Sequence, residues 1–147
     1  MKVLIASALL VVSSISYAQQ KLTVNYEWEI SHKCGKKSPE ITIGGIPPGS
    51  TLLDIKMVDL DYKGWDHGGG LLKNEEGFPE IFKISEGGLN RGYDGPCPPN
   101  FNAHGHDYEI TVIAKDKSNQ VIGKGSVVKT FSAKAVKNNL FHCLNHI

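Results

Sequence analysis

Apolar and polar residues alternate with a period of two in three separate segments, residues 22–30, 51–59 and 108–115. In the first segment the apolar positions are Leu22, Val24, Tyr26, Trp28 and Ile30. Successive side chains of a β-strand point to opposite faces of a sheet, so this period indicates strands that bury one face. The pattern therefore predicts a fold built on β-strands.

The rest of the chain is predicted to contain turns, shorter strands and one helix. Residues 41–43 and 121–122 are predicted to be short strands, and residues 63–70 a glycine-rich loop. Residues 77–99 show no sustained period and are predicted to form a long irregular connection. Residues 132–143 place apolar side chains at helical spacing. Together these features predict a mainly β fold, an antiparallel β-sandwich with a C-terminal helix.

The first 18 residues have the features of a secretory signal peptide. Lys2 precedes an apolar stretch over residues 3–12, and the small residues Ser16 and Ala18 suit signal peptidase. The stretch is shorter than the roughly 20 apolar residues that span a bilayer, so we expect no transmembrane segment. Cleavage after Ala18 would leave 147 minus 18, or 129, residues. We expect residues 19–147 to form one domain that is secreted or periplasmic.

The charge of the chain is almost balanced, with 16 lysine and arginine residues against 15 aspartate and glutamate residues. A net charge of +1 gives no basic footprint for a phosphate backbone, so we expect no nucleic-acid partner. No serine or cysteine motif supplies a nucleophile next to a base, so we do not expect an enzyme. We also expect no cofactor. The oligomeric state stays open between a monomer and a homodimer.

Polar side chains lie at the ends of two of the predicted strands. Asp59 has the same parity as the apolar residues of segment 51–59. His106 has the same parity as Tyr108 and the apolar residues of segment 108–115. Because residues of one parity share a face of a strand, we expect Asp59, His106 and Tyr108 to face the core.

A metal site is an alternative role for the histidines, since imidazole and carboxylate groups bind zinc. Its ligands would be Asp59, His67, His104 and His106. Their spacing matches no standard metal motif, so we expect no metal. Three cysteines, Cys34, Cys97 and Cys143, lie in the predicted mature chain. In an exported protein this number indicates one disulfide and one odd thiol.

Four blocks of residues, in order along the chain, resemble the phosphatidylethanolamine-binding (Raf kinase inhibitor-like) family in its bacterial form. The run Gly-Tyr-Asp-Gly-Pro-Cys-Pro-Pro at residues 92–99 and the His-Asp-Tyr at residues 106–108 resemble the family's signature. Residues 34–39 look like its Cys-x-Gly and Ser-Pro block, and residues 59–61 look like its Asp-Pro-Asp motif. His67 takes the place of its pocket histidine. The resemblance extends from about Leu22 to the predicted C-terminal helix.

The resemblance implies a β-sandwich with a small cavity at one end that accepts phosphate or carboxylate groups. The implied pocket consists of Asp59, His67, His106 and Tyr108, with Tyr93 and the Pro98-Pro99 turn at its rim. Imidazole and phenol groups can donate hydrogen bonds to an anion, and imidazoles charge at mildly acid pH. The resemblance also implies a disulfide between Cys34 and Cys97, which leaves Cys143 unpaired.

The function implied is therefore an exported binding protein for a small anionic ligand or a phospholipid headgroup. Because family relatives also inhibit kinases and proteases, an inhibitor that acts on a protein target through its surface is the alternative. A hydrolase that uses Asp59 and His67 is the third possibility.

The sequence departs from the family pattern in three places near the implied pocket. After Asp61 the family usually continues Ala-Pro, whereas this chain has Tyr62 and Lys63. Three glycines follow His67 where the family commonly has tryptophan, so we expect a mobile loop without an aromatic wall. Asp107 stands where arginine is frequent.

Overall fold

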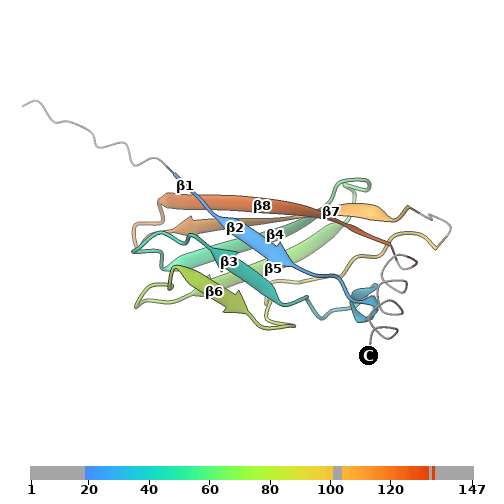
Figure 1. The fold of residues 1–147 in the computed structure, drawn as a ribbon, viewed down its shortest axis with the longest axis horizontal. Coiled ribbons are helices and arrows are strands. Elements are labelled where there is room, and N and C mark those ends of the chain that lie inside the picture. Colours follow the sequence, from blue (N-terminus) through green and yellow to red (C-terminus); the bar gives the residue numbers. More distant parts are fainter. Residues whose placement is uncertain (1–18, 101–103, 133, 135–147) are drawn as a thin grey trace, which may run out of the picture.

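The computed structural model describes residues 19–100, 104–132 and 134 (Figure 1). The predicted signal peptide over residues 1–18 lies outside the described residues. Nearly all of the helix predicted over residues 132–143 also lies outside them.

The described residues form eight strands in two sheets, so the protein is mainly β, as predicted. The strands are β1 (Gln20–Lys21), β2 (Thr23–Tyr26), β3 (Ile41–Gly44), β4 (Leu52–Asp59), β5 (Asp66–Lys73), β6 (Ile81–Ile84), β7 (His106–Lys115) and β8 (Val121–Phe131). The larger sheet has the order β1-β8-β7-β4-β5, and the smaller sheet has the order β2-β3-β6. Neighbouring strands are antiparallel except β1, which is parallel to β8.

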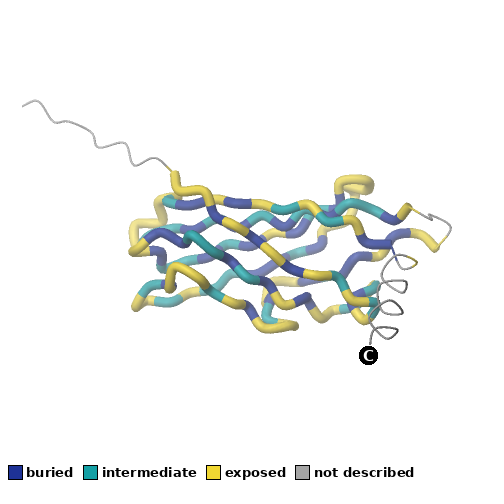
Figure 2. The backbone as a smooth tube through the Cα atoms, viewed as in Figure 1, coloured by how far each residue is buried: buried dark blue, intermediate teal, exposed yellow. Residues whose placement is uncertain are grey.

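Side chains from both sheets belong to one hydrophobic core. On β4 and β7 every second residue is buried, a pattern that Figure 2 shows as alternating dark blue segments. The smaller sheet contributes Val24, Tyr26, Ile41, Ile43 and Ile84 to the same core. The strands predicted at residues 51–59 and 108–115 are therefore confirmed. The register of β4 with β7 pairs Asp59 with Tyr108 at the end of the ladder.

The strand predicted over residues 22–30 is wrong in its second half. β2 ends at Tyr26, because its partner β3 offers only four residues for pairing. The chain then forms a 3-10 helix, Ile30–His32. A hydrogen bond of 2.8 Å from the backbone N–H of Glu29 to Nδ1 of His32 closes this turn.

The glycine-rich loop predicted at residues 63–70 is also wrong, because its second half belongs to β5, which pairs with β4. Glycine has no side chain and so shows no apolar period, yet it permits a close approach of two backbones. A Cβ at Gly69 would lie 1.9 Å from the carbonyl oxygen of Ile55. The β4–β5 ladder shifts register at the same place, between Lys56 and Val58.

The sequence-based prediction misses strand β6 and makes strand β8 too short. β8 covers residues 121–131 instead of residues 121–122, and β6 lies inside the segment 77–99 that was expected to be irregular. β8 pairs with β7 at ten positions, although Gly123 and Gly125 interrupt its apolar pattern. Its extended conformation therefore depends on a partner strand more than on its own sequence.

Candidate functional site

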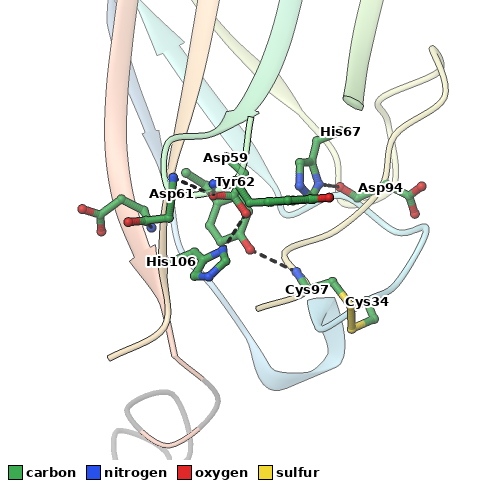
Figure 3. Close-up of polar contacts among 10 residues, drawn as sticks. Cys34, Asp59, Asp61, Tyr62, His67, Asp94, Cys97 and His106 are labelled. Carbon is green, nitrogen blue, oxygen red and sulfur yellow. Dashed lines mark hydrogen bonds and ion pairs between the residues drawn. A yellow bond between two sulfur atoms is a disulfide. The ribbon is translucent and has the colours of Figure 1, made fainter. Parts of the chain in front are cut away.

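The paired ends of β4 and β7 bring a carboxylate and an imidazole together. Nδ1 of His106 donates a hydrogen bond of 2.8 Å to Oδ2 of Asp59 (Figure 3). The other carboxylate oxygen, Oδ1, accepts the backbone N–H groups of Asp61 at 2.9 Å and Tyr62 at 2.8 Å. Asp59 is only 3% exposed. A carboxylate held in this way fixes the orientation of the imidazole that it contacts.

The surroundings of Asp59 favour its ionised form. Burial alone would raise the pKa of this carboxyl, but the hydrogen bonds from His106 and from the amides of Tyr62 and Asp61 outweigh burial and hold the pKa below its usual value. The folded state therefore binds the proton more weakly than the unfolded chain does. The resulting stabilisation is fully present above about pH 5 and is lost as the pH falls through the lowered pKa.

Substitution of this carboxylate has an expected effect on stability that depends on pH. Asp59→Asn should lower the free energy of unfolding by about 2 kcal/mol at pH 7, because the charge-assisted hydrogen bonds are lost. The difference from the wild type should shrink between about pH 5 and about pH 2, as the wild-type carboxyl takes up its proton. Urea unfolding at several pH values measures this difference.

The control is Asp54→Asn, which changes a carboxylate on the same strand outside this network. A difference between the wild type and Asp59→Asn that stays constant down to about pH 2 would contradict the role of the charge.

Tyr108 lies opposite Asp59 in the β4–β7 ladder and is completely buried. Its phenol oxygen accepts a hydrogen bond of 3.1 Å from the backbone N–H of Cys97. Burial, and then the negative charge of Asp59, raise the pKa of the phenol, so it keeps its proton. A neutral phenol can donate a hydrogen bond to the Asp59 carboxylate or to an anion bound beside it.

His67 approaches the same place from β5 and is 3% exposed. Its Nδ1 lies 2.8 Å from the backbone carbonyl oxygen of Asp94. Because a carbonyl only accepts, Nδ1 carries the hydrogen and Nε2 is left to contact other groups. The imidazole meets the ring of Tyr108 edge to face, with 5.3 Å between ring centroids.

Residues 91–97 reach the site along the edge of β5. Gly69 and Arg91 exchange two backbone hydrogen bonds of 3.0 Å. Farther along, the N–H of Asp94 donates to the carbonyl of His67 at 3.0 Å. These contacts place the Asp94 carbonyl beside the imidazole of His67.

A disulfide joins this segment to the loop that follows β2. The sulfur atoms of Cys34 and Cys97 are 2.03 Å apart, and they form the pair that the resemblance implied. The backbone N–H of Cys34 also donates to the carbonyl of Pro96 at 2.9 Å. The disulfide therefore anchors the residue whose N–H group contacts Tyr108.

The structure brings together four of the six predicted ligand-binding residues, Asp59, His67, His106 and Tyr108. Tyr93, expected at the rim, lies in the hydrophobic core and is 4% exposed. Its hydroxyl has no hydrogen-bond partner among the described residues. Pro98, the residue after Cys97, was also expected at the rim and is buried.

Sequence reasoning missed the groups that hold these side chains in place. The carbonyl of Asp94 and the N–H of Cys97 are backbone groups, which have no signature in a sequence. Oδ2 of Asp61 accepts the backbone N–H of Asp107 at 2.7 Å, a second link between the ends of β4 and β7. The Asp-x-Asp spacing of residues 59–61 was the available signal for this link.

The described residues contain no group of three or more His, Cys, Asp or Glu side chains arranged to hold a metal ion. Nor does this part of the chain include a helix with the length and apolar character needed to cross a membrane. A second group of histidine and cysteine residues in the sequence, His142, Cys143 and His146, lies outside the described residues.

Comparisons with known proteins do not assign this chain to a family. No protein-family model matches the chain, and no curated protein matches it.

Proposed function

We propose that this chain is an exported binding protein with a β-sandwich of the phosphatidylethanolamine-binding type, whose pocket accepts a small anionic group. The motifs at residues 34–39, 59–61, 92–99 and 106–108 support the family assignment. The predicted signal peptide and the disulfide between Cys34 and Cys97 support export.

The observation that carries the proposal is the meeting of two histidines, a tyrosine and an aspartate at one end of the larger sheet (Figure 3). Burial of such groups costs free energy, and clusters of this kind are found preferentially at functional sites. In each imidazole the contact described above engages Nδ1 and leaves Nε2 to bind a ligand. Nε2 becomes a donor when an imidazole is protonated, and together with the neutral phenol of Tyr108 it then forms a set of donors suited to phosphate or carboxylate oxygens.

Asp59 has an orienting role in this proposal, because a carboxylate repels an anionic ligand. Its Oδ2 holds His106 through Nδ1 and so directs Nε2 of that ring away from the carboxylate. In the neutral ring Nε2 is an acceptor, whereas in protonated His106 both ring nitrogens donate, so Nε2 can then bind an anion while Nδ1 stays paired with Asp59. Anion binding should therefore strengthen at mildly acid pH.

The test is a calorimetric titration of the mature protein with phosphate, acetate and phosphoethanolamine at pH 5.5 and pH 7.5. We expect tighter binding at the lower pH, and a loss of at least about tenfold in affinity in His106→Ala, since a hydrogen bond to a charged group is removed. His104→Ala, which removes an exposed histidine two residues earlier, is the matched control and should bind like the wild type.

The competing functions give different results. A protein that binds none of these anions at either pH contradicts the pocket and favours an inhibitor that acts on a kinase or protease through its surface. Turnover of esters or phosphoesters that disappears in His67→Ala would instead identify a hydrolase.

A further inference from the structure

A hollow lies on the larger sheet, where β4 and β5 run side by side at one edge (Figure 1). Its volume is about 330 Å³. It is lined by the charged residues Asp54, Lys56, Asp66 and Arg91 and by the backbones of Gly68 and Gly69. Sites for small molecules have volumes of about 300 to 1,000 Å³, so this hollow has room for a small ligand.

The strand register explains why the surface is hollow at this place. On β4, Asp54 and Lys56 alternate with buried residues, so their side chains point away from the core. Lys56 pairs with Gly69 of β5, and Gly69 pairs in turn with Arg91. Neighbouring strands lie about 4.8 Å apart, so the backbones of Lys56 and Arg91 are about 10 Å apart. Gly69 places no side chain between them.

The positive groups of the hollow are available to a ligand. Nη1 of Arg91 lies 3.7 Å from Oδ1 of Asp54, which is longer than a hydrogen bond. Within the part of the chain that the structure describes, no hydrogen bond engages the guanidinium of Arg91 or the ammonium of Lys56. A guanidinium can bind both oxygens of a carboxylate through two parallel N–H groups. Arg91 therefore keeps its capacity to hold a carboxylate.

Two carboxylates line the same hollow and limit which ligands fit it. Oδ1 of Asp66 accepts the backbone N–H of Gly68 at 3.0 Å, which holds this carboxylate beside the glycines. Asp54 lies two residues from Lys56 on the same face of β4. An anion alone is repelled by Asp54 and Asp66, and a cation alone is repelled by Lys56 and Arg91. The charge pattern therefore suits a molecule that carries both charges.

We propose that this hollow binds a free α-amino acid, with its carboxylate between Arg91 and Lys56 and its ammonium on Asp54 or Asp66. A free amino acid carries both charges on one carbon, whereas a peptide carries them at opposite ends. The small volume of the hollow also favours a ligand of few atoms. Because Asp54 and Lys56 point away from the core, this site is separate from the candidate anion site and does not depend on it.

The test is an NMR titration of the isotope-labelled mature protein at pH 7.5 with three related probes. L-Alanine carries both charges, propionate carries only the carboxylate, and ethylamine carries only the ammonium. The backbone amides of Gly68, Gly69 and Arg91 report binding at the hollow, and the same spectra show whether each variant is folded. The variants are Arg91→Gln and Asp54→Asn. The matched control is Lys73→Gln, which removes a charge from an exposed residue of β5 outside the hollow.

L-Alanine should shift these amides in a saturable way and bind at least about tenfold more tightly than propionate or ethylamine, since each single-charge probe loses a charge-assisted contact. Arg91→Gln and Asp54→Asn should each weaken L-alanine binding by about tenfold, whereas Lys73→Gln should bind like the wild type. Equal affinities for L-alanine and propionate would indicate a simple anion site and overturn the proposal. Unchanged L-alanine binding in both variants, or no saturable shift at the three amides, would overturn it as well.

Discussion

Replacement of both Cys34 and Cys97 by serine is expected to lower the free energy of unfolding by about 4 kcal/mol, because the disulfide closes a loop with a sequence separation of 63 residues. The constraint acts mainly on the unfolded chain, whose conformational freedom increases when the link is removed. The substitution should also weaken the candidate site. The N–H of Cys97 contacts the phenol of Tyr108, and the disulfide anchors that part of the backbone.

Guanidinium unfolding of the double variant and of the wild type, each with and without a dithiol reductant, measures this effect. The reductant should destabilise the wild type by the same amount and leave the double variant unchanged. The comparison separates this disulfide from any effect of Cys143, which both proteins retain. A loss below about 1 kcal/mol would mean that the 34–97 link contributes little to stability.

Gly69→Ala is expected to cost about 3 kcal/mol or more, because the added methyl group has no room. A Cβ at this position would lie 1.9 Å from the carbonyl oxygen of Ile55, and that backbone is held in the β4–β5 ladder. Gly69 also exchanges two hydrogen bonds with Arg91, so displacement of the strand would move the segment that carries Asp94. Loss of anion binding should accompany the loss of stability.

Gly92→Ala is the matched control for this substitution. Gly92 has a φ of +61°, but apart from its two chain neighbours no residue has an atom within 4 Å of a Cβ there, so alanine tests backbone conformation without tertiary overlap. We expect a cost of about 1 to 2 kcal/mol for the left-handed conformation. Urea unfolding of both variants provides the comparison. Equal losses in the two proteins would show that the backbones of β4 and β5 separate easily at Gly69.

The sequence predicted the strands that carry most of the candidate site. Alternation over residues 51–59 and 108–115 is a local property, because the direction of each side chain depends only on its position along the strand. Parity alone therefore placed Asp59 and Tyr108 on the core-facing rows that the structure shows to be buried. His106, with the same parity, is partly buried and contacts Asp59.

The same reasoning failed at β5 and β8, because glycines interrupt the alternation of apolar and polar residues in these strands. The sequence pattern predicts a loop at Gly68, Gly69 and Gly70, yet these residues belong to a strand that brings His67 to the site. Glycine-rich strands form because a partner pairs with them, and no local pattern records that partner.

The sequence by itself determined the mainly β class of this protein and the residue types available at the end of the larger sheet. Only the tertiary structure decided their partners. His106 contacts Asp59 at a sequence separation of 47 residues, and His67 contacts the carbonyl of Asp94 at a separation of 27. Tyr108 contacts the N–H of Cys97 at a separation of 11. Strand register and loop path set these contacts, and both depend on packing between segments that are distant in the chain.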